Sequence, residues 1–233
     1  TGVQTCALPI LYYKAIAPNI AFIRATTCDS EGYATFEDEV MYLDALVIAQ
    51  AVHNNGGIVM MQVQKMVKKA TLHPKSVRIP GYLVDIVVID PDQTQLYGGA
   101  PVNRFISGDF VLDDSQQTAL PLNQRKLVAR RALFEMRKGA VGNVGVGIAD
   151  GIGLVAREEG CADDFILTVE TGPIGGITSQ GIAFGANVNT RAILDMTSQF
   201  DFYHGGGLDV CYLSFAEVDR HGNVGVHKFN GKI

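Results

Sequence analysis

The alternation of strand-like and helix-like segments in the second half of the sequence most limits the folds this chain can adopt. Residues 141–148 and 165–170 are predicted strands, and residues 149–159 between them are a predicted helix. Strand, helix and strand in this order form a parallel pair joined by a crossover helix. We therefore predict an α/β fold with open, mostly parallel sheets and flanking helices.

The first half of the sequence has the same character. Residues 19–25 form a predicted strand, and the turn residues Asp29-Ser-Glu-Gly32 lead into residues 33–36 as a hairpin-like unit. A helix is expected over 40–54, with one apolar face at Val40, Leu43, Val47, Ile48 and Ala51. Short β-branched runs at 58–63 and 85–90 are typical of strands inside a sheet that is covered on both faces.

The polar stretch 113–122 is the predicted linker between two domains, because it precedes a new helix over 123–138 with Asn123 as its cap. We assign residues 11–120 to the end of a first domain and residues 121–233 to the start of a second. An apolar strand followed by Asp-x-x-Gly occurs at Asp29 and again at Asp219, which suggests that the two domains are related.

Composition and charge exclude several classes of partner. The sequence has 233 residues, of which 47% are hydrophobic, so it can bury a sizeable core. The formal net charge of −5 is spread without a basic run, which disfavours nucleic acid and anionic membrane surfaces. No apolar stretch approaches the roughly 20 residues of a membrane span, so we expect a cytoplasmic protein.

The cysteines and the first residues need separate treatment. Cys6, Cys28, Cys161 and Cys211 have neither C-x-x-C spacing nor histidines at ligand spacing, so we expect reduced thiols and no metal. Residues 1–10 look like the translation of a sequencing adapter, so we exclude them from fold reasoning and expect the chain to be a fragment.

The most informative candidate for chemistry is Glu170, which ends a buried-looking strand before a loop containing Gly172, Gly175 and Gly176. Ligands of open α/β sheets bind at the carboxyl ends of the strands. Partial desolvation makes a carboxylate there a stronger nucleophile, and glycines let the backbone approach a bulky substrate. The alternative is a structural glutamate that pairs with an arginine or caps a helix.

A second glycine-rich segment, 142–153, runs from a predicted strand into a helix, where backbone amides can hold phosphate or an acyl oxygen. A dinucleotide fingerprint is the competing interpretation, but Asp150 occupies the place of its third glycine. A nucleotide-dependent dehydrogenase is therefore disfavoured and stays open. The glycines can also serve tight packing of the strand against the helix.

At Glu170 the sequence resembles a known family, the two-domain single-chain coenzyme A transferases of the acetate or short-chain acyl type. The likeness runs from about residue 11 to 233. It rests on four motifs: 23–32 (IRATTCDSEG), 141–148 (VGNVGVGI), 169–176 (VETGPIGG) and 215–224 (FAEVDRHGNV).

The resemblance implies a ping-pong transfer of coenzyme A (CoA) from an acyl-CoA to a carboxylate such as acetate, with no cofactor or metal and CoA as a substrate. Glu170-Thr-Gly172 stands where this family has its nucleophilic Glu-x-Gly. The family's CoA-contacting segment matches the five residues Gly145, Val146, Gly147, Ile148 and Ala149.

Two departures from the family pattern accompany the resemblance, because its later glycine-rich loop and the opening half of its first domain have no counterpart in these residues. We expect the full-length protein to be a homo-oligomer. Against the transferase stand the dehydrogenase and a non-catalytic acyl-CoA-binding module.

Overall fold

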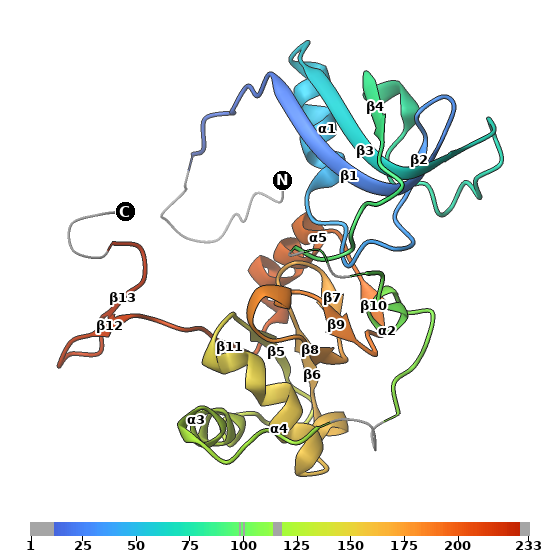
Figure 1. Ribbon diagram of the computed structural model, residues 1–233. Coiled ribbons are helices and arrows are strands. Elements are labelled where there is room, and N and C mark those ends of the chain that lie inside the picture. The colour runs from blue at the N-terminus through green and yellow to red at the C-terminus, as the bar shows by residue number, and fades with distance from the viewer. Residues whose placement is uncertain (1–11, 98, 100, 114–117, 229–233) are drawn as a thin grey trace.

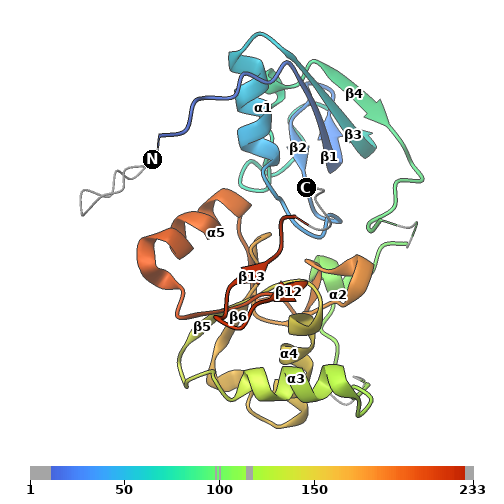
Figure 2. The ribbon, with the colours of Figure 1, turned by 90° about the vertical axis from the view of Figure 1, so that its left-hand side faces the viewer.

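Two α/β units make up the computed structural model, which describes residues 12–97, 99, 101–113 and 118–228 (Figure 1). The predicted adapter segment 1–10, with Cys6, lies outside the described residues, as do the chain end at 231–233 and part of the predicted linker. In both views the first unit lies on one side of α5 (Met196–Phe202) and the second sheet lies on the other (Figures 1 and 2). The α/β fold class is confirmed.

The first sheet has four strands in the order β2-β1-β3-β4. Their bounds are Ile20–Asp29 for β1, Ala34–Thr35 for β2, Ile58–Val67 for β3 and Ile86–Ile89 for β4. β1, β3 and β4 run parallel, and β2 pairs antiparallel with β1. Helix α1 (Ala45–Asn54) covers one face of this sheet (Figure 2).

The turn between β1 and β2 forms as the sequence predicts. The Asp29 side chain accepts hydrogen bonds from the N–H groups of Glu31 at 2.9 Å and Tyr33 at 3.1 Å. Gly32 takes a φ of 84°, a conformation that glycine adopts at little cost. A turn with the same bonds joins β12 (Glu217–Val218) to β13 (Val224–Gly225), where Asp219 accepts from the N–H groups at 221 and 223.

Helix α1 begins at Ala45, so the prediction of a helix from residue 40 is wrong at its start. Leu43 has a φ of 50°, and its carbonyl accepts a hydrogen bond from the N–H of Met196 in the second unit. This contact holds the preceding segment outside the helix. The helix buries Ala49 and Val52 against the sheet, whereas Val47 and Ile48, which were predicted to face the core, are 39% and 43% exposed.

The opposite face of the first sheet is only partly covered among the described residues, so the expectation of a covered sheet holds for the second half of β1 and fails for its first half. Phe22 is 79% exposed, and Ile86 of β4, which is separated from it by Met60 of β3, is 42% exposed. In the first half of β1 and of β3, buried positions alternate with more exposed ones because successive side chains point to opposite faces and α1 covers only one.

The second sheet has five strands in the order β10-β7-β6-β5-β11. Their bounds are Val141–Val144 for β5, Ile166–Thr168 for β6, Pro173–Ile174 for β7, Ala192–Ile193 for β10 and Val210–Tyr212 for β11. β6, β5 and β11 are parallel, as predicted for the strands at 141 and 165, while β7 runs antiparallel to both of its neighbours, β6 and β10. Both sheets are therefore mixed.

The remaining elements are short. The helices are α2 (Arg104–Ser107), α3 (Gln124–Leu133) and α4 (Ile152–Glu158), and β8 (Ile177–Thr178) pairs with β9 (Asn187–Val188). Single 3₁₀ turns cover Gly81–Leu83, Ile148–Gly151, Ala162–Asp164 and Gly181–Ala183, and a wider π-helical turn covers Tyr203–Gly207. None of the described helices is long and apolar enough to cross a membrane.

Asn123 caps α3 as predicted, since its side chain accepts from the Lys126 N–H at 3.1 Å. The helix ends at Leu133 and does not continue to residue 138, because the next N–H groups bond three residues back and tighten the chain into turns. The helix buries Ala129 and Leu133, which are 1% and 5% exposed, whereas Phe134 just after its end is 68% exposed.

The hydrophobic residues form two separate cores. One cluster spans Ala21 to Leu83 and belongs to the first sheet, and the other spans Ala129 to Leu167 and belongs to the second. Leu120 packs against the second cluster, next to the boundary predicted between residues 120 and 121.

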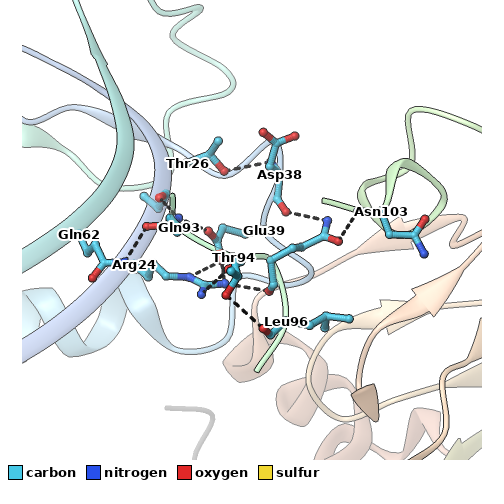
Figure 3. Close-up of polar contacts among 11 residues, drawn as sticks. Arg24, Thr26, Asp38, Glu39, Gln62, Gln93, Thr94, Leu96 and Asn103 are labelled. Carbon is cyan, nitrogen blue, oxygen red and sulfur yellow. Dashed lines mark hydrogen bonds and ion pairs between the residues drawn. The ribbon is translucent and has the colours of Figure 1, made fainter. Parts of the chain in front are cut away.

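A buried polar network in the first unit fixes the segment that leaves β4 (Figure 3). Arg24 pairs with Glu39 at 2.6 Å and donates to the Thr94 carbonyl at 2.8 Å, while Gln93 donates to the other Glu39 oxygen at 2.8 Å. Burial raises the pKa of Glu39, and the guanidinium of Arg24 opposes that effect. Nearby, the Gln95 side chain accepts from the Asn103 N–H at 2.8 Å, which draws the chain toward α2.

Candidate functional site

The parallel strands β5, β6 and β11 bring the candidate residues to one edge of the second sheet. Asn143 of β5 pairs with Thr168 of β6, and Val144 pairs with Tyr212 of β11. Because the strands are parallel, the segments that follow them leave the sheet on the same side. The loop 145–149 follows β5, and Glu170 follows β6 two residues beyond the last paired position.

Glu170 lies on a tight turn and not within the strand, because β6 ends at Thr168 and the predicted strand end at 170 is two residues too late. The Val169 N–H bonds to the Pro173 carbonyl, and the Gly172 N–H bonds back to Val169, both at 3.0 Å. The turn leaves Glu170 partly exposed, with its Oε2 accepting a hydrogen bond of 3.1 Å from the side-chain amide of Asn143. A carboxylate held in this way is both oriented and accessible.

The turn requires glycine at position 172. Gly172 has a φ of 123°, which L residues rarely adopt, and a Cβ there would lie 2.0 Å from the carbonyl oxygen of Leu194. The Leu194 N–H in turn bonds to the Gly172 carbonyl at 3.0 Å. This close approach ties the turn that carries Glu170 to the chain between β10 and α5.

Gly175 and Gly176 lie between β7 and β8, each with a positive φ. They line a cavity of about 430 Å³ together with Arg157 and Arg191, and its lining does not include Glu170. A Cβ on Gly176 would meet the Val188 carbonyl at 2.3 Å. The structure thus gives both glycines a packing role and shows no contact between them and the Glu170 carboxylate.

The glycine-rich loop begins where β5 ends at Val144, so the strand predicted to reach residue 148 is four residues too long. The Gly145 N–H is used by the sheet, because it bonds to the Tyr212 carbonyl at 2.8 Å. Gly147 has φ 106° and ψ −129°, and a Cβ there would lie 2.6 Å from the Ser214 hydroxyl oxygen.

After Gly145 the loop turns outward. Val146 is 56% exposed and Ile148 37% exposed, while Ala149 is buried under the second core. Within the part of the chain that the structure describes, the N–H groups of Val146 and Gly147 have no hydrogen-bond acceptor. Two adjacent free donors on an exposed glycine loop can bind an anionic or carbonyl oxygen.

Asp150 argues against a dinucleotide at this loop. Its carboxylate is 1% exposed, accepts a hydrogen bond of 2.8 Å from Gln180 and lies 3.9 Å from Arg125. A pyrophosphate would be placed where this buried carboxylate stands at the start of the crossover helix, and like charges repel there.

Sequence patterns did not identify Asn143, Thr168 and Tyr203, which form a hydrogen-bonded group connected to Glu170 through Asn143. Asn143 is 4% exposed and Thr168 2% exposed, and the Tyr203 hydroxyl contacts both side chains. Asn143 lies in the glycine-rich segment 142–153, and a polar residue inside a buried strand is a signal that could have marked it as a site residue. Tyr203 lies 33 residues after Glu170 in the sequence, and only the fold brings it to the site.

Cys211 of β11 borders the same group, with its Sγ 3.5 Å from the Asn143 Oδ1. Burial and the negative charge of Glu170 raise the pKa of this thiol. Among the described residues no three His, Cys, Asp or Glu side chains gather as a metal-binding group.

Comparison with known proteins gives consistent matches. Residues 7–90 match the family Coenzyme A transferase. The chain is 96% identical over 223 residues to Acetate CoA-transferase YdiF of Escherichia coli (strain K12), an alignment that covers 96% of this chain and 42% of that protein. It is 40% identical over 221 residues to Caffeate CoA-transferase of Acetobacterium woodii, covering 94% of this chain and 42% of that protein.

A solved structure agrees with these matches. The crystal structure of Acyl-CoA transferase YdiF from Escherichia coli O157:H7, a thioester complex with CoA, matches with a TM-score of 0.86 at 91% identity, covering 95% of this chain and 43% of that one. The chain therefore spans about 42% of the length of the curated relatives it matches.

Proposed function

Since this chain belongs to the coenzyme A transferase family, we propose that it carries the nucleophile of an enzyme that moves CoA between an acyl-CoA and a free carboxylate. Glu170 is the proposed nucleophile. The observation that carries this assignment is its position on a tight turn at the carboxyl edge of parallel strands, where its carboxylate is partly exposed and bonded to Asn143.

The proposed reaction has two halves. The Glu170 carboxylate attacks the thioester carbonyl of the acyl-CoA, the C–S bond breaks, and the products are a mixed anhydride and the CoA thiolate. The thiolate then attacks the glutamyl carbonyl, the anhydride C–O bond breaks, and the donor leaves as a carboxylate. A thioester between Glu170 and CoA remains, and an acceptor carboxylate reverses both steps.

The glycine loop 145–149 supports this chemistry as the proposed CoA-binding segment. The free N–H groups of Val146 and Gly147 can stabilise an oxyanion or a carbonyl oxygen of the bound thioester. Contacts with the CoA tail supply binding energy for the less favourable anhydride step. Gly172 serves the active site by shaping the turn of Glu170, and for Gly175 and Gly176 the support is limited to the shape of the same loop.

The acyl group is proposed to be short, with acetate as one acceptor, because a relative with 96% identity is named an acetate CoA-transferase. The relative at 40% identity is named for caffeate, so the fold accommodates more than one acyl class. A cytoplasmic location, a homo-oligomer and the division at residues 120 and 121 are further proposals. The two cores and the two Asp-x-x-Gly turns of the same geometry support the division.

The test uses a full-length hybrid in which the 223 aligned residues of this chain replace the matching segment of the Escherichia coli relative. The hybrid is incubated with acetyl-CoA and reduced with borohydride, and the modified peptide is mapped by mass spectrometry. We expect reduction at Glu170 and at no other carboxylate. An unmodified Glu170 in a protein that binds CoA would move the assignment to an acyl-CoA-binding module, and bound NAD would favour the dehydrogenase.

Two matched variants sharpen the result. Glu170→Gln keeps the size of the side chain and removes the nucleophile, so transfer should be abolished while CoA binding stays within a few fold. Glu135→Gln removes a surface carboxylate that pairs with Arg131, and transfer should be unchanged. Wild-type turnover by Glu170→Gln would contradict the proposal.

A further inference from the structure

A chain of side-chain hydrogen bonds runs from Glu170 to the backbone of β5. The Asn143 Nδ2 lies 3.1 Å from Glu170 Oε2 and 3.2 Å from the Tyr203 hydroxyl oxygen. That hydroxyl lies 2.6 Å from Thr168 Oγ1, which in turn donates to the Gly142 carbonyl at 3.0 Å. The residues come from β5, β6 and the turn after α5, so the tertiary fold assembles them.

The hydroxyl and amide protons of this series of hydrogen bonds have only one arrangement that satisfies every bond. The single hydroxyl proton of Thr168 goes to a carbonyl, which can only accept, so the Tyr203 proton goes to Thr168. The Tyr203 oxygen then acts as an acceptor toward Asn143. Asn143 must therefore present its NH₂ group, whose two protons go to Tyr203 and to Glu170.

The opposite orientation of the Asn143 amide is unfavourable for two reasons. Its carbonyl oxygen would face the Glu170 carboxylate, and it would also face a tyrosine oxygen that has no proton to give. On its other side the amide oxygen lies 3.5 Å from the Cys211 thiol, a weak donor that supports the same orientation.

We propose that Tyr203 is a positioning residue, which fixes the Asn143 amide as a hydrogen-bond donor to the Glu170 carboxylate through its own bond to Thr168. The inference rests on the proposed role of Glu170 as nucleophile. Tyr203 has no contact with the carboxylate itself, and it acts by keeping one N–H aimed at Glu170 Oε2 while the carboxylate is attacked and regenerated.

The ring of Tyr203 is held independently of its hydroxyl. Its centroid lies 5.9 Å from that of Phe200 and 6.1 Å from that of Phe202, in edge-to-face and tilted arrangements. Tyr203→Phe therefore removes the hydroxyl while leaving the aromatic packing in place. This makes the substitution a test of orientation more than of folding.

In the full-length hybrid, Tyr203→Phe should lower kcat about tenfold and leave KM for acetyl-CoA within about twofold, because the change affects the nucleophile and not the glycine loop. Rates are normalised to active sites titrated as borohydride-reduced Glu170. The control is Tyr42→Phe, a half-buried tyrosine of the first unit whose ring meets Phe36 edge-to-face at 5.8 Å, and it should keep both parameters.

A second pair of variants tests the same series of hydrogen bonds at Thr168. Thr168→Val removes the hydroxyl and should lower kcat about as much as Tyr203→Phe. Thr168→Ser keeps the hydroxyl, so its kcat should match that of the wild-type hybrid. The double variant Tyr203→Phe/Thr168→Val should also lose about tenfold and not about a hundredfold, because the two residues act as one unit. If Tyr203→Phe fails to fold, Thr168→Val and Thr168→Ser still test the positioning role.

The outcomes separate the two proposals. If the wild-type hybrid is labelled at Glu170 and the Tyr203→Phe variant has wild-type kcat, the positioning role is overturned and the proposed function stays intact. Equal losses in Thr168→Ser and Thr168→Val, or multiplicative losses in the double variant, also overturn it. A wild-type hybrid with no labelled Glu170 overturns both proposals.

Discussion

Replacing Gly172 by alanine should destabilise the chain and displace the turn that carries Glu170. The added Cβ would lie 2.0 Å from the Leu194 carbonyl oxygen, and the contacted atom is backbone, so it cannot rotate away. Restoring an ordinary contact requires the two segments to separate by about 1 Å or more. That movement would break the bond of 3.0 Å between the Leu194 N–H and the Gly172 carbonyl.

The magnitude follows from two contributions. A non-glycine residue at a φ of 123° costs about 1–3 kcal/mol, and overpacking against the fixed carbonyl adds about 1–3 kcal/mol. We therefore expect Gly172→Ala to lower the free energy of unfolding by about 2–6 kcal/mol. The matched control is Gly160→Ala, at a φ of 71° with no atom within 4 Å of the new Cβ, which should cost only about 1–2 kcal/mol.

Urea unfolding followed by circular dichroism measures both variants in this chain, and borohydride trapping in the full-length hybrid reports on the site. Gly172→Ala should unfold at a clearly lower urea concentration than Gly160→Ala and should yield less labelled Glu170. Equal midpoints for the two variants would refute the reasoning, because the clash with Leu194 is the difference between them.

Three further predictions follow from buried or charged groups. Gln199 is fully buried, and neither of its side-chain polar atoms has a hydrogen-bond partner among the described residues. Gln199→Met should therefore raise the free energy of unfolding by about 1 kcal/mol and shift the urea midpoint upward, and a lower midpoint would contradict this. Burial acts to raise the pKa of Glu158, but the hydrogen bond from Lys126 and a backbone N–H lower it overall. Its contribution is therefore complete above the unfolded pKa of about 4.3 and is lost as the pH falls through the lowered folded pKa. Glu158→Gln should cost up to about 1 kcal/mol at pH 7, and this cost should begin to shrink only below about pH 4, as measured by thermal unfolding across pH. The raised pKa of Cys211 predicts slow alkylation by iodoacetamide at neutral pH, and Glu170→Gln should speed it by removing the nearby negative charge; an unchanged rate would argue against their proximity.

Much of the candidate site was visible in the sequence because it depends on local patterns. The alternation around residues 141–176 identified parallel strands, and a carboxylate followed by glycines marked the edge where ligands bind. The Asp-x-x-Gly repeats predicted two turns, and Asn123 predicted a helix cap, since each of these relies on bonds within a few residues.

Element boundaries and buried faces were predicted less well, because tertiary contacts set them. α1 starts late since Leu43 bonds to Met196 of the other unit, and β5 stops at Val144 since the loop turns outward after Gly145. Each of the two longer helices buries one alanine beside one larger residue, Val52 in α1 and Leu133 in α3, and which residues are buried depends on how closely each helix approaches its neighbours.

The sequence by itself determined the α/β class, the glycine-dependent turns and the candidate nucleophile, because these follow from periodicity and from conformations that few residues can adopt. Only the tertiary structure decided what surrounds Glu170. Asn143, Thr168 and Tyr203 are separated by up to 60 residues, and no local signal relates them. Their contact exists because parallel pairing sets Asn143 beside Thr168 and the turn after α5 brings the Tyr203 hydroxyl to both.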